Sequence, residues 1–152
     1  MAVSVRMASA QETDLVASLR IEFIEEGDGS ALPLPLAEAT RKWMRDLTAL
    51  GQMQSWIAED DEGTIGVVTV RIRGASPRED DLVGREAYVH NLYVRSKHRR
   101  GGVGRALMKA LMDWCEEQGY NRLALRASAM GRPLYEQLGF VADRAMVFKA
   151  KD

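Results

Sequence analysis

The stretch 92–104, Leu-Tyr-Val-Arg-Ser-Lys-His-Arg-Arg-Gly-Gly-Val-Gly, constrains the fold of this chain more than any other. An apolar strand runs into a basic loop, the loop into glycines, and the glycines into a segment with helical spacing. Glycines let the backbone approach a phosphate closely, and the first turn of a helix carries N–H groups that have no acceptor within the helix. The pattern therefore predicts a cradle for a phosphorylated ligand, with a solvated basic turn as the alternative.

The composition is that of one globular domain, which we expect to span residues 1–152. Apolar residues make up 46% of the chain and charged residues 28%, a balance typical of folded proteins. The net charge of −1 gives no global reason to expect nucleic acid or a membrane as partner. No apolar run reaches about 20 residues, and no secretory signal is found. The single cysteine, Cys115, cannot form an internal disulfide, so we expect a cytoplasmic location.

Hydrophobic periodicity predicts strands and helices in alternation. Strand-like runs lie at 3–8, 54–59, 64–73, 86–94, 122–127 and, as one strand or a strand pair, 140–149. Helical spacing and end signals lie at about 14–26, 36–50, 103–117 and 131–138. This order predicts a mixed sheet with helices on its faces. The helix after the glycines should connect two parallel strands, which places the cradle at the carboxyl end of a strand, where ligands bind.

Two motifs, separated by one helix and one strand, carry a family resemblance. The first is Leu92-x-Val94 followed by Arg99-Arg100-Gly101-Gly102-Val103-Gly104, and the second is Leu134-Tyr135-Glu136-Gln137-Leu138-Gly139-Phe140. They resemble the Arg/Gln-x-x-Gly-x-Gly/Ala signature and the Leu-Tyr-Glu-x-Leu-Gly-Phe motif of the GCN5-related N-acetyltransferases, the GNAT superfamily. The resemblance implies an α/β (α+β) fold: a mixed, mostly antiparallel central sheet with a parallel splayed strand pair, flanked by about four helices.

Two other glycine-rich motifs fit less well. A dinucleotide fingerprint needs a third glycine, but Leu107 stands where that glycine belongs. A P-loop needs Gly-Lys-Ser/Thr, which does not follow here.

The resemblance implies that the chain binds acetyl-CoA as its acyl donor. Backbone groups of Leu92, Tyr93 and Val94 would pair with the pantetheine arm and the acetyl carbonyl, while their side chains are expected in the core. The pyrophosphate would lie on the glycine turn and the start of the helix. The residues implied there are Arg99 and Arg100, which add charge, and Gly101, Gly102, Val103, Gly104 and Arg105.

The second motif implies a catalytic acid. Tyr135 matches the tyrosine that, in many GNAT enzymes, can protonate the leaving thiolate, and a phenol with a pKa near 10 retains its proton at neutral pH. The alternative is an aromatic side chain packed behind Phe140. Seven residues earlier, Ser128 stands where the family usually has an asparagine that bonds the pantetheine. Ser128 is therefore predicted either to contact CoA or to be a helix-cap or turn residue. Pro133 fits that helix only in its first turn.

The general base is less well specified by the sequence. His90 lies two residues before Leu92, and some family members use a histidine or glutamate on this strand, often through water. An unperturbed histidine suits proton uptake near neutral pH. Glu86, a water path without a dedicated base, and a purely structural histidine remain as alternatives. No metal is expected.

The acceptor amine has no comparable signature. The acids Glu25, Glu26 and Asp28 end the first predicted helix, where they would either attract a cationic amine or be solvated. We expect direct acetyl transfer to an amine, with a small molecule as the leading acceptor. A protein lysine or N-terminus, and a non-catalytic acyl-CoA-binding regulatory protein, are the alternatives. The resemblance also allows a homodimer.

Overall fold

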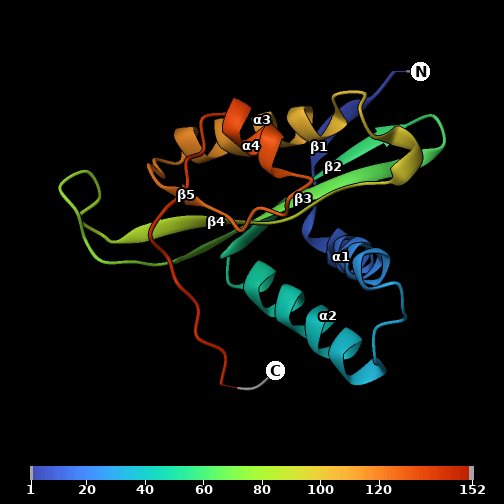
Figure 1. The fold of residues 1–152 in the computed structure, drawn as a ribbon, viewed down its shortest axis with the longest axis horizontal. Helices are drawn as coiled ribbons and strands as arrows, with labels where there is room; N and C mark the ends of the chain where they lie inside the picture. Colours follow the sequence, from blue (N-terminus) through green and yellow to red (C-terminus); the bar gives the residue numbers. More distant parts are fainter. Residues whose placement is uncertain (1, 151–152) are drawn as a thin grey trace.

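A five-stranded sheet lies between two layers of helices in the computed structural model, which describes residues 2–150 (Figure 1). Helices α1 (Thr13–Asp28) and α2 (Leu34–Ala49) cover one face. The helices α3 (Val103–Glu117) and α4 (Arg132–Gln137) lie on the other. The predicted mixed sheet with about four helices is confirmed. None of the helices in the described range is long and apolar enough to span a membrane.

The strands follow one another across the sheet in chain order. Neighbours pair antiparallel from β1 to β4, and only β4 and β5 pair in parallel. The strands are β1 (Ser4–Met7), β2 (Met53–Asp60), β3 (Gly63–Gly74), β4 (Arg85–Val94) and β5 (Leu123–Ala124). Two 3₁₀ turns, η1 (Ala10–Glu12) and η2 (Ser96–His98), precede α1 and the glycine turn.

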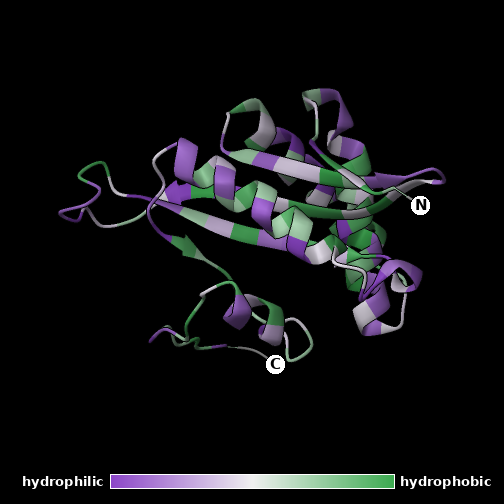
Figure 2. Cartoon of the chain, turned by 90° about the horizontal axis from the view of Figure 1, so that it is seen from above, coloured by the Kyte–Doolittle hydropathy of each residue, from purple (hydrophilic) through white to green (hydrophobic). Residues whose placement is uncertain are grey.

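The alternating side chains of the strands divide the core into two clusters. In β3, Val68 and Val70 pack toward α3, which contributes Leu107 and Leu111. Val67 packs toward α1 and α2 on the opposite face. Along the helices, hydrophobic and hydrophilic residues alternate (Figure 2). This pattern is typical of helices that bury one side against a sheet and expose the other to solvent.

A bulge interrupts β4 near its carboxyl end. Val67 pairs with Tyr93, but Thr69 pairs with His90, so β4 holds one extra residue over this interval. Asn91 accommodates it with a left-handed backbone, φ 56°. The parallel partner β5 pairs only with Ala87 and Tyr88. Beyond Tyr88, therefore, no strand of residues 2–150 pairs with that edge of β4, and the predicted splayed pair is confirmed.

The last part of the chain departs from prediction. The strand expected at 122–127 contains only Leu123 and Ala124, and no strand forms at 140–149. A strand requires a neighbouring edge that accepts its hydrogen bonds, and no described segment pairs with these residues. Met146 and Phe148 consequently keep 95% and 90% of their surface exposed.

Two substitutions should separate the packed core from this terminal segment. Leu111→Ala removes a fully buried side chain between α3 and the sheet, and we expect it to lower the free energy of unfolding by about 2–5 kcal/mol. Phe148→Ala removes an exposed side chain and should change it by less than about 0.5 kcal/mol. Urea unfolding measures both values. A large loss from Phe148→Ala would mean that this segment packs onto the domain.

Candidate functional site

Three segments of the predicted site converge at Gly104. A β-carbon at this position would lie 3.5 Å from Leu134 Cδ2, 3.9 Å from Val94 Cγ2 and 4.0 Å from Leu92 Cδ2. The first turn of α3, the open end of β4 and the start of α4 therefore meet at one point. These are ordinary van der Waals distances, so the three segments pack around Gly104 and both sequence motifs contribute to a single site.

The glycine turn has the geometry of an anion cradle. Arg100 and Gly102 both have left-handed backbones, with φ 67° and 84°. Gly102 is the N-cap of α3 and provides no side-chain cap. The first intrahelical bond runs from Ala106 N to Gly102 O, so the N–H groups of residues 103–105 have no acceptor within the helix. They point out of the helix start, where the dipole favours an anion.

The basic side chains around the cradle differ in their contacts. Arg99 donates to Val94 O and to Glu26, both at 2.7 Å, so its guanidinium ties the loop to α1. Arg105 donates to the side-chain oxygen of Gln137, the last residue of α4. Arg100 is exposed. Of the three, Arg100 is thus the side chain whose charge is most available to a phosphate.

The three residues predicted at the open end of β4 have core side chains, as expected. Tyr93 is buried toward α1, 5.6 Å from the ring of Phe23 between centroids. Burial and the neighbouring Glu22 raise the pKa of Tyr93 to about 12. Leu92 and Val94 pack against the opposite cluster. Residues 92–94 lie along the stretch of β4 that β5 does not pair with, an edge that an extended ligand can join, and Val94 O there accepts the bond from Arg99.

Tyr135 and Ser128 lie together at the start of α4. The Tyr135 ring packs edge-on against Phe140, with 6.0 Å between centroids, and burial raises the pKa of its phenol. The phenol therefore stays protonated at neutral pH, as a proton donor must. The Ser128 hydroxyl accepts a bond from Gly131 N at 3.1 Å, which closes the turn before α4. Pro133 lies in the first turn of α4, as its backbone requires.

His90 faces α1 and α2 and lies among arginines. Burial, followed by the charges of Arg20, Arg71 and Arg73, lowers its pKa to about 4. Its Nε2 is buried and has no partner within residues 2–150. His90 is therefore neutral near pH 7, with a nitrogen free to make a hydrogen bond, but it is a much weaker base than an ordinary histidine.

The predicted acidic candidates are largely engaged in structure. Burial alone would raise the pKa of Glu86, but ion pairs with Arg73 and Arg122 outweigh it and lower that pKa. Glu25 accepts a bond from Leu32 N at 2.7 Å and fixes the loop after α1. Glu26 pairs with Arg99.

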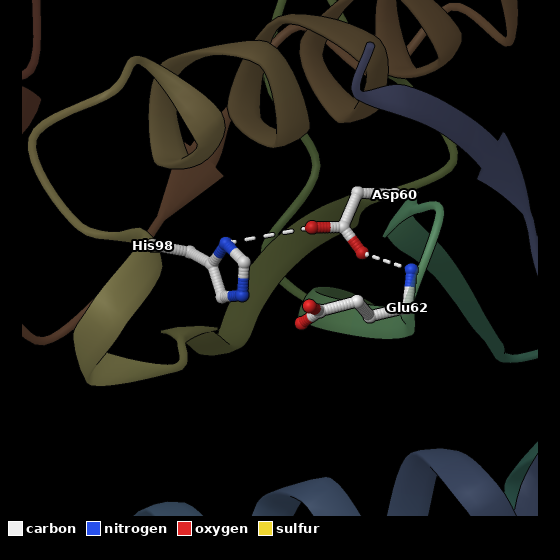
Figure 3. A group of neighbouring side chains, drawn as sticks. All are labelled: Asp60, Glu62 and His98. Atoms are coloured by element: carbon white, nitrogen blue, oxygen red, sulfur yellow. Dashed lines mark hydrogen bonds and ion pairs between the residues drawn. The ribbon is translucent and has the colours of Figure 1, made fainter. Parts of the chain in front are cut away.

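An acid–histidine cluster anchors the loop that leads to the cradle (Figure 3). Asp60 accepts a bond from Glu62 N at 2.8 Å and pairs with His98 Nδ1 at 3.7 Å. Lys97 pairs with Glu62 at 3.0 Å. A run of acids before a glycine is typical of a solvated turn, yet the side chain of Asp60 is only 1% exposed. Ligand-type atoms of Asp60, Glu62 and His98 lie within 4.8 Å of one another, but the protein contacts account for their arrangement.

Arg20, Arg71 and Asn91 belong to the site but are not among the predicted residues. A signal for Arg71 exists, because strict alternation from Val67 and Thr69 places it on a buried face of β3. Arg20 follows Leu19 within the apolar face of α1. The bulge at Asn91 leaves no clear mark in the sequence, since it depends on the pairing with β3.

The family assignment follows from a match over most of the chain. The model of the Acetyltransferase (GNAT) family matches residues 17–140, which include both motifs and the whole of the site. The chain belongs to this GNAT family. The assignment agrees with the splayed strands, the bulge and the cradle, and it confirms the resemblance inferred from the sequence.

Relatives in sequence are GNAT proteins of greater length. N-acetyltransferase 8 from Homo sapiens is 34% identical over 91 residues, which cover 56% of this chain and 37% of that protein. Probable N-acetyltransferase family 8 member 5 from Mus musculus is 31% identical over 113 residues, covering 72% and 45%. This chain thus spans less than half the length of these curated relatives.

Solved GNAT structures share the whole fold. A predicted acetyltransferase from Clostridium acetobutylicum, solved with acetyl-CoA, has a TM-score of 0.87 at 21% identity, covering 97% of this chain and 96% of that one. A GCN5-related N-acetyltransferase from Ralstonia eutropha has a TM-score of 0.83 at 24% identity, covering 97% and 98%.

The environment of His90 predicts a pH dependence of stability. Its folded-state pKa of about 4 lies below the unfolded value near 6.5. Between these values the unfolded chain binds the additional proton, so the free energy of unfolding should fall as the pH drops from 6.5 to 4, by up to roughly 3 kcal/mol. Urea unfolding across this range measures the effect, and His90→Gln should remove it. An unchanged pH dependence in His90→Gln would contradict this account of the site.

Proposed function

We propose that this GNAT protein is an acetyl-CoA-dependent N-acetyltransferase that transfers the acetyl group directly to an amine. The observation that carries the proposal is the combination of an open β4 edge with the α3 cradle at Gly104. A phosphate-binding helix start beside an unpaired strand edge suits a ligand with a pyrophosphate and an extended, amide-containing arm. CoA has both. We also propose that residues 1–152 act as a single domain.

In the proposed reaction the chain positions the two reactants and moves protons. N–H groups of residues 103–105 hold the pyrophosphate, and Arg100 adds positive charge. Backbone groups at 92–94 bind the pantetheine arm and polarise the thioester carbonyl. Tyr135 donates its proton to the departing sulfur. The free Nε2 of His90 accepts a hydrogen bond from the amine or from a water that takes up its proton.

A small-molecule amine is the proposed acceptor. The hydrogen bond from Leu32 N to Glu25 fixes the loop between α1 and α2, and the bond from Arg99 to Glu26 ties the end of α1 to the loop after β4. A fixed loop beside the site favours a compact acceptor over a protein surface. A cytoplasmic location follows from the same proposal, since acetyl-CoA is a metabolite of the cell interior.

Blocking the cradle should abolish binding of CoA. Gly102→Trp places a large side chain at the start of α3, so we expect the affinity for CoA in calorimetry to fall at least about 100-fold, consistent with loss of several phosphate contacts. Gly51→Trp is the matched control. Gly51 has a similar φ of 70° and equally open surroundings, but it ends α2. Retained affinity in Gly102→Trp would disprove the cradle.

Removing the phenolic hydroxyl should slow the reaction without weakening the binding of CoA. Tyr135→Phe keeps the packing against Phe140 but cannot protonate the thiolate, so kcat should fall about 100-fold or more. Thiol release measures kcat, and calorimetry measures the affinity for CoA. If kcat is unchanged, Tyr135 is a packing residue and solvent protonates the thiolate.

A further inference from the structure

Two arginines share an aromatic platform beside the bulge in β4. The guanidinium carbons of Arg20, from α1, and Arg71, from β3, lie 5.5 and 5.9 Å from the centre of the Trp43 ring. Trp43 also packs edge-on against His90, with 5.5 Å between ring centroids. Two positive charges, an indole and an imidazole thus gather on the face of β4 that looks toward α1 and α2.

These two arginines lack the carboxylate partners that the other arginines nearby possess. Arg20 donates to Asn91 Oδ1, a neutral amide oxygen, and Arg71 Nε has no partner within residues 2–150. The next arginine along β3, Arg73, pairs with Glu86 at 2.5 Å. A guanidinium group matches a carboxylate in geometry and charge. The two arginines therefore form a cluster that could bind an anion.

Unpaired hydrogen-bond donors in the same place indicate what would fill it. Asn91 is only 6% exposed, and neither its buried Nδ2 nor Arg71 Nε has a partner in the part of the chain that the structure describes. Both groups can only donate. Buried donors without acceptors are rare because they are costly. A ligand with two acceptor oxygens and a negative charge would satisfy the donors and the arginines together.

We propose that Arg20 and Arg71 bind the carboxylate of the acceptor, which is therefore a small amine that also carries a carboxylate, such as an amino acid. This inference rests on the proposed acetyl transfer. Arg20 bonds Asn91, which directly precedes Leu92, so its guanidinium lies within roughly 10 Å of the backbone at 92–94. Arg71 lies opposite Tyr88 and extends the cluster away from that backbone. That separation suits a molecule whose amine and carboxylate are a few bonds apart.

The charges on the surrounding helices agree with an anionic rather than a polycationic acceptor. Glu25 and Glu26, predicted either to attract a cationic amine or to be solvated, bind Leu32 N and Arg99. Arg20 and Arg71 are only partly buried as whole residues, although Arg71 Nε itself is buried. Trp43, Tyr88 and His90 would contact the apolar part of the acceptor.

Matched acceptor pairs test the inference. Each pair is an amino acid and its carboxamide, with rates referred to the unprotonated amine because the two differ in amine pKa. We expect the wild type to favour the acid by about 10- to 100-fold in kcat/KM, the range for a charge-assisted hydrogen bond. Arg71→Gln should reduce this ratio to near 1. Arg71→Lys keeps the positive charge but not the two-pronged guanidinium, so it should retain part of the preference for the acid. This variant also tests the inference if Arg71→Gln fails to fold. The control Arg45→Gln, on the exposed side of α2, should keep the wild-type ratio.

Each outcome decides between specific accounts. If Arg71→Gln lowers the rates for acid and amide equally, Arg71 merely packs on Trp43 and the inference is overturned. If the wild type acetylates both without preference, the carboxylate subsite is wrong while acetyl transfer stands. If CoA binds but no amine reacts, the proposed function fails, and calorimetry in the presence of CoA decides the subsite. Binding of the acid but not of the amide supports it, and binding of neither rejects it.

Discussion

The site depends on unequal pairing along the two edges of β4. On one edge β4 pairs with β3 along its length, while on the other it pairs with β5 over two residues only. A central strand with unpaired backbone groups would ordinarily be unfavourable, because each buried N–H or C=O needs a partner. The firm antiparallel ladder with β3 holds β4 in place, so that its open edge remains available to a ligand.

The bulge at Asn91 gives the two faces of β4 different roles. It changes the phase of the strand, so that Leu92 and Val94 pack toward α3 while His90 and Asn91 face α1 and α2. The face toward α3 lies near the glycine turn, where backbone N–H groups are available to bind a ligand. The opposite side carries arginines and aromatic rings. In the proposed reaction the donor and the acceptor therefore meet at the same strand, recognised by different chemistry.

The sequence predicted the features that depend on local chemistry. The cradle follows from glycines between a strand and an amphipathic helix, and both need only nearby residues. The sequence was a poorer guide to features that depend on residues far away along the chain. Residues 140–149 have strand-like composition but pair with no edge in residues 2–150, and the buried side chain of Asp60 lies against His98, which is distant in the sequence. The low pKa of His90 likewise arises from burial and from arginines that come from α1 and β3.

The central claim, that CoA fills the space between the open edge of β4 and the α3 cradle, can be measured directly. Titrating CoA into ¹⁵N-labelled protein and following the backbone amide resonances reports where the ligand contacts the chain. The account predicts that the largest shifts fall on residues 103–105 and on the open stretch of β4 at 89–94, with little change in α2. Shifts confined to other segments, or none at saturating CoA, would contradict it.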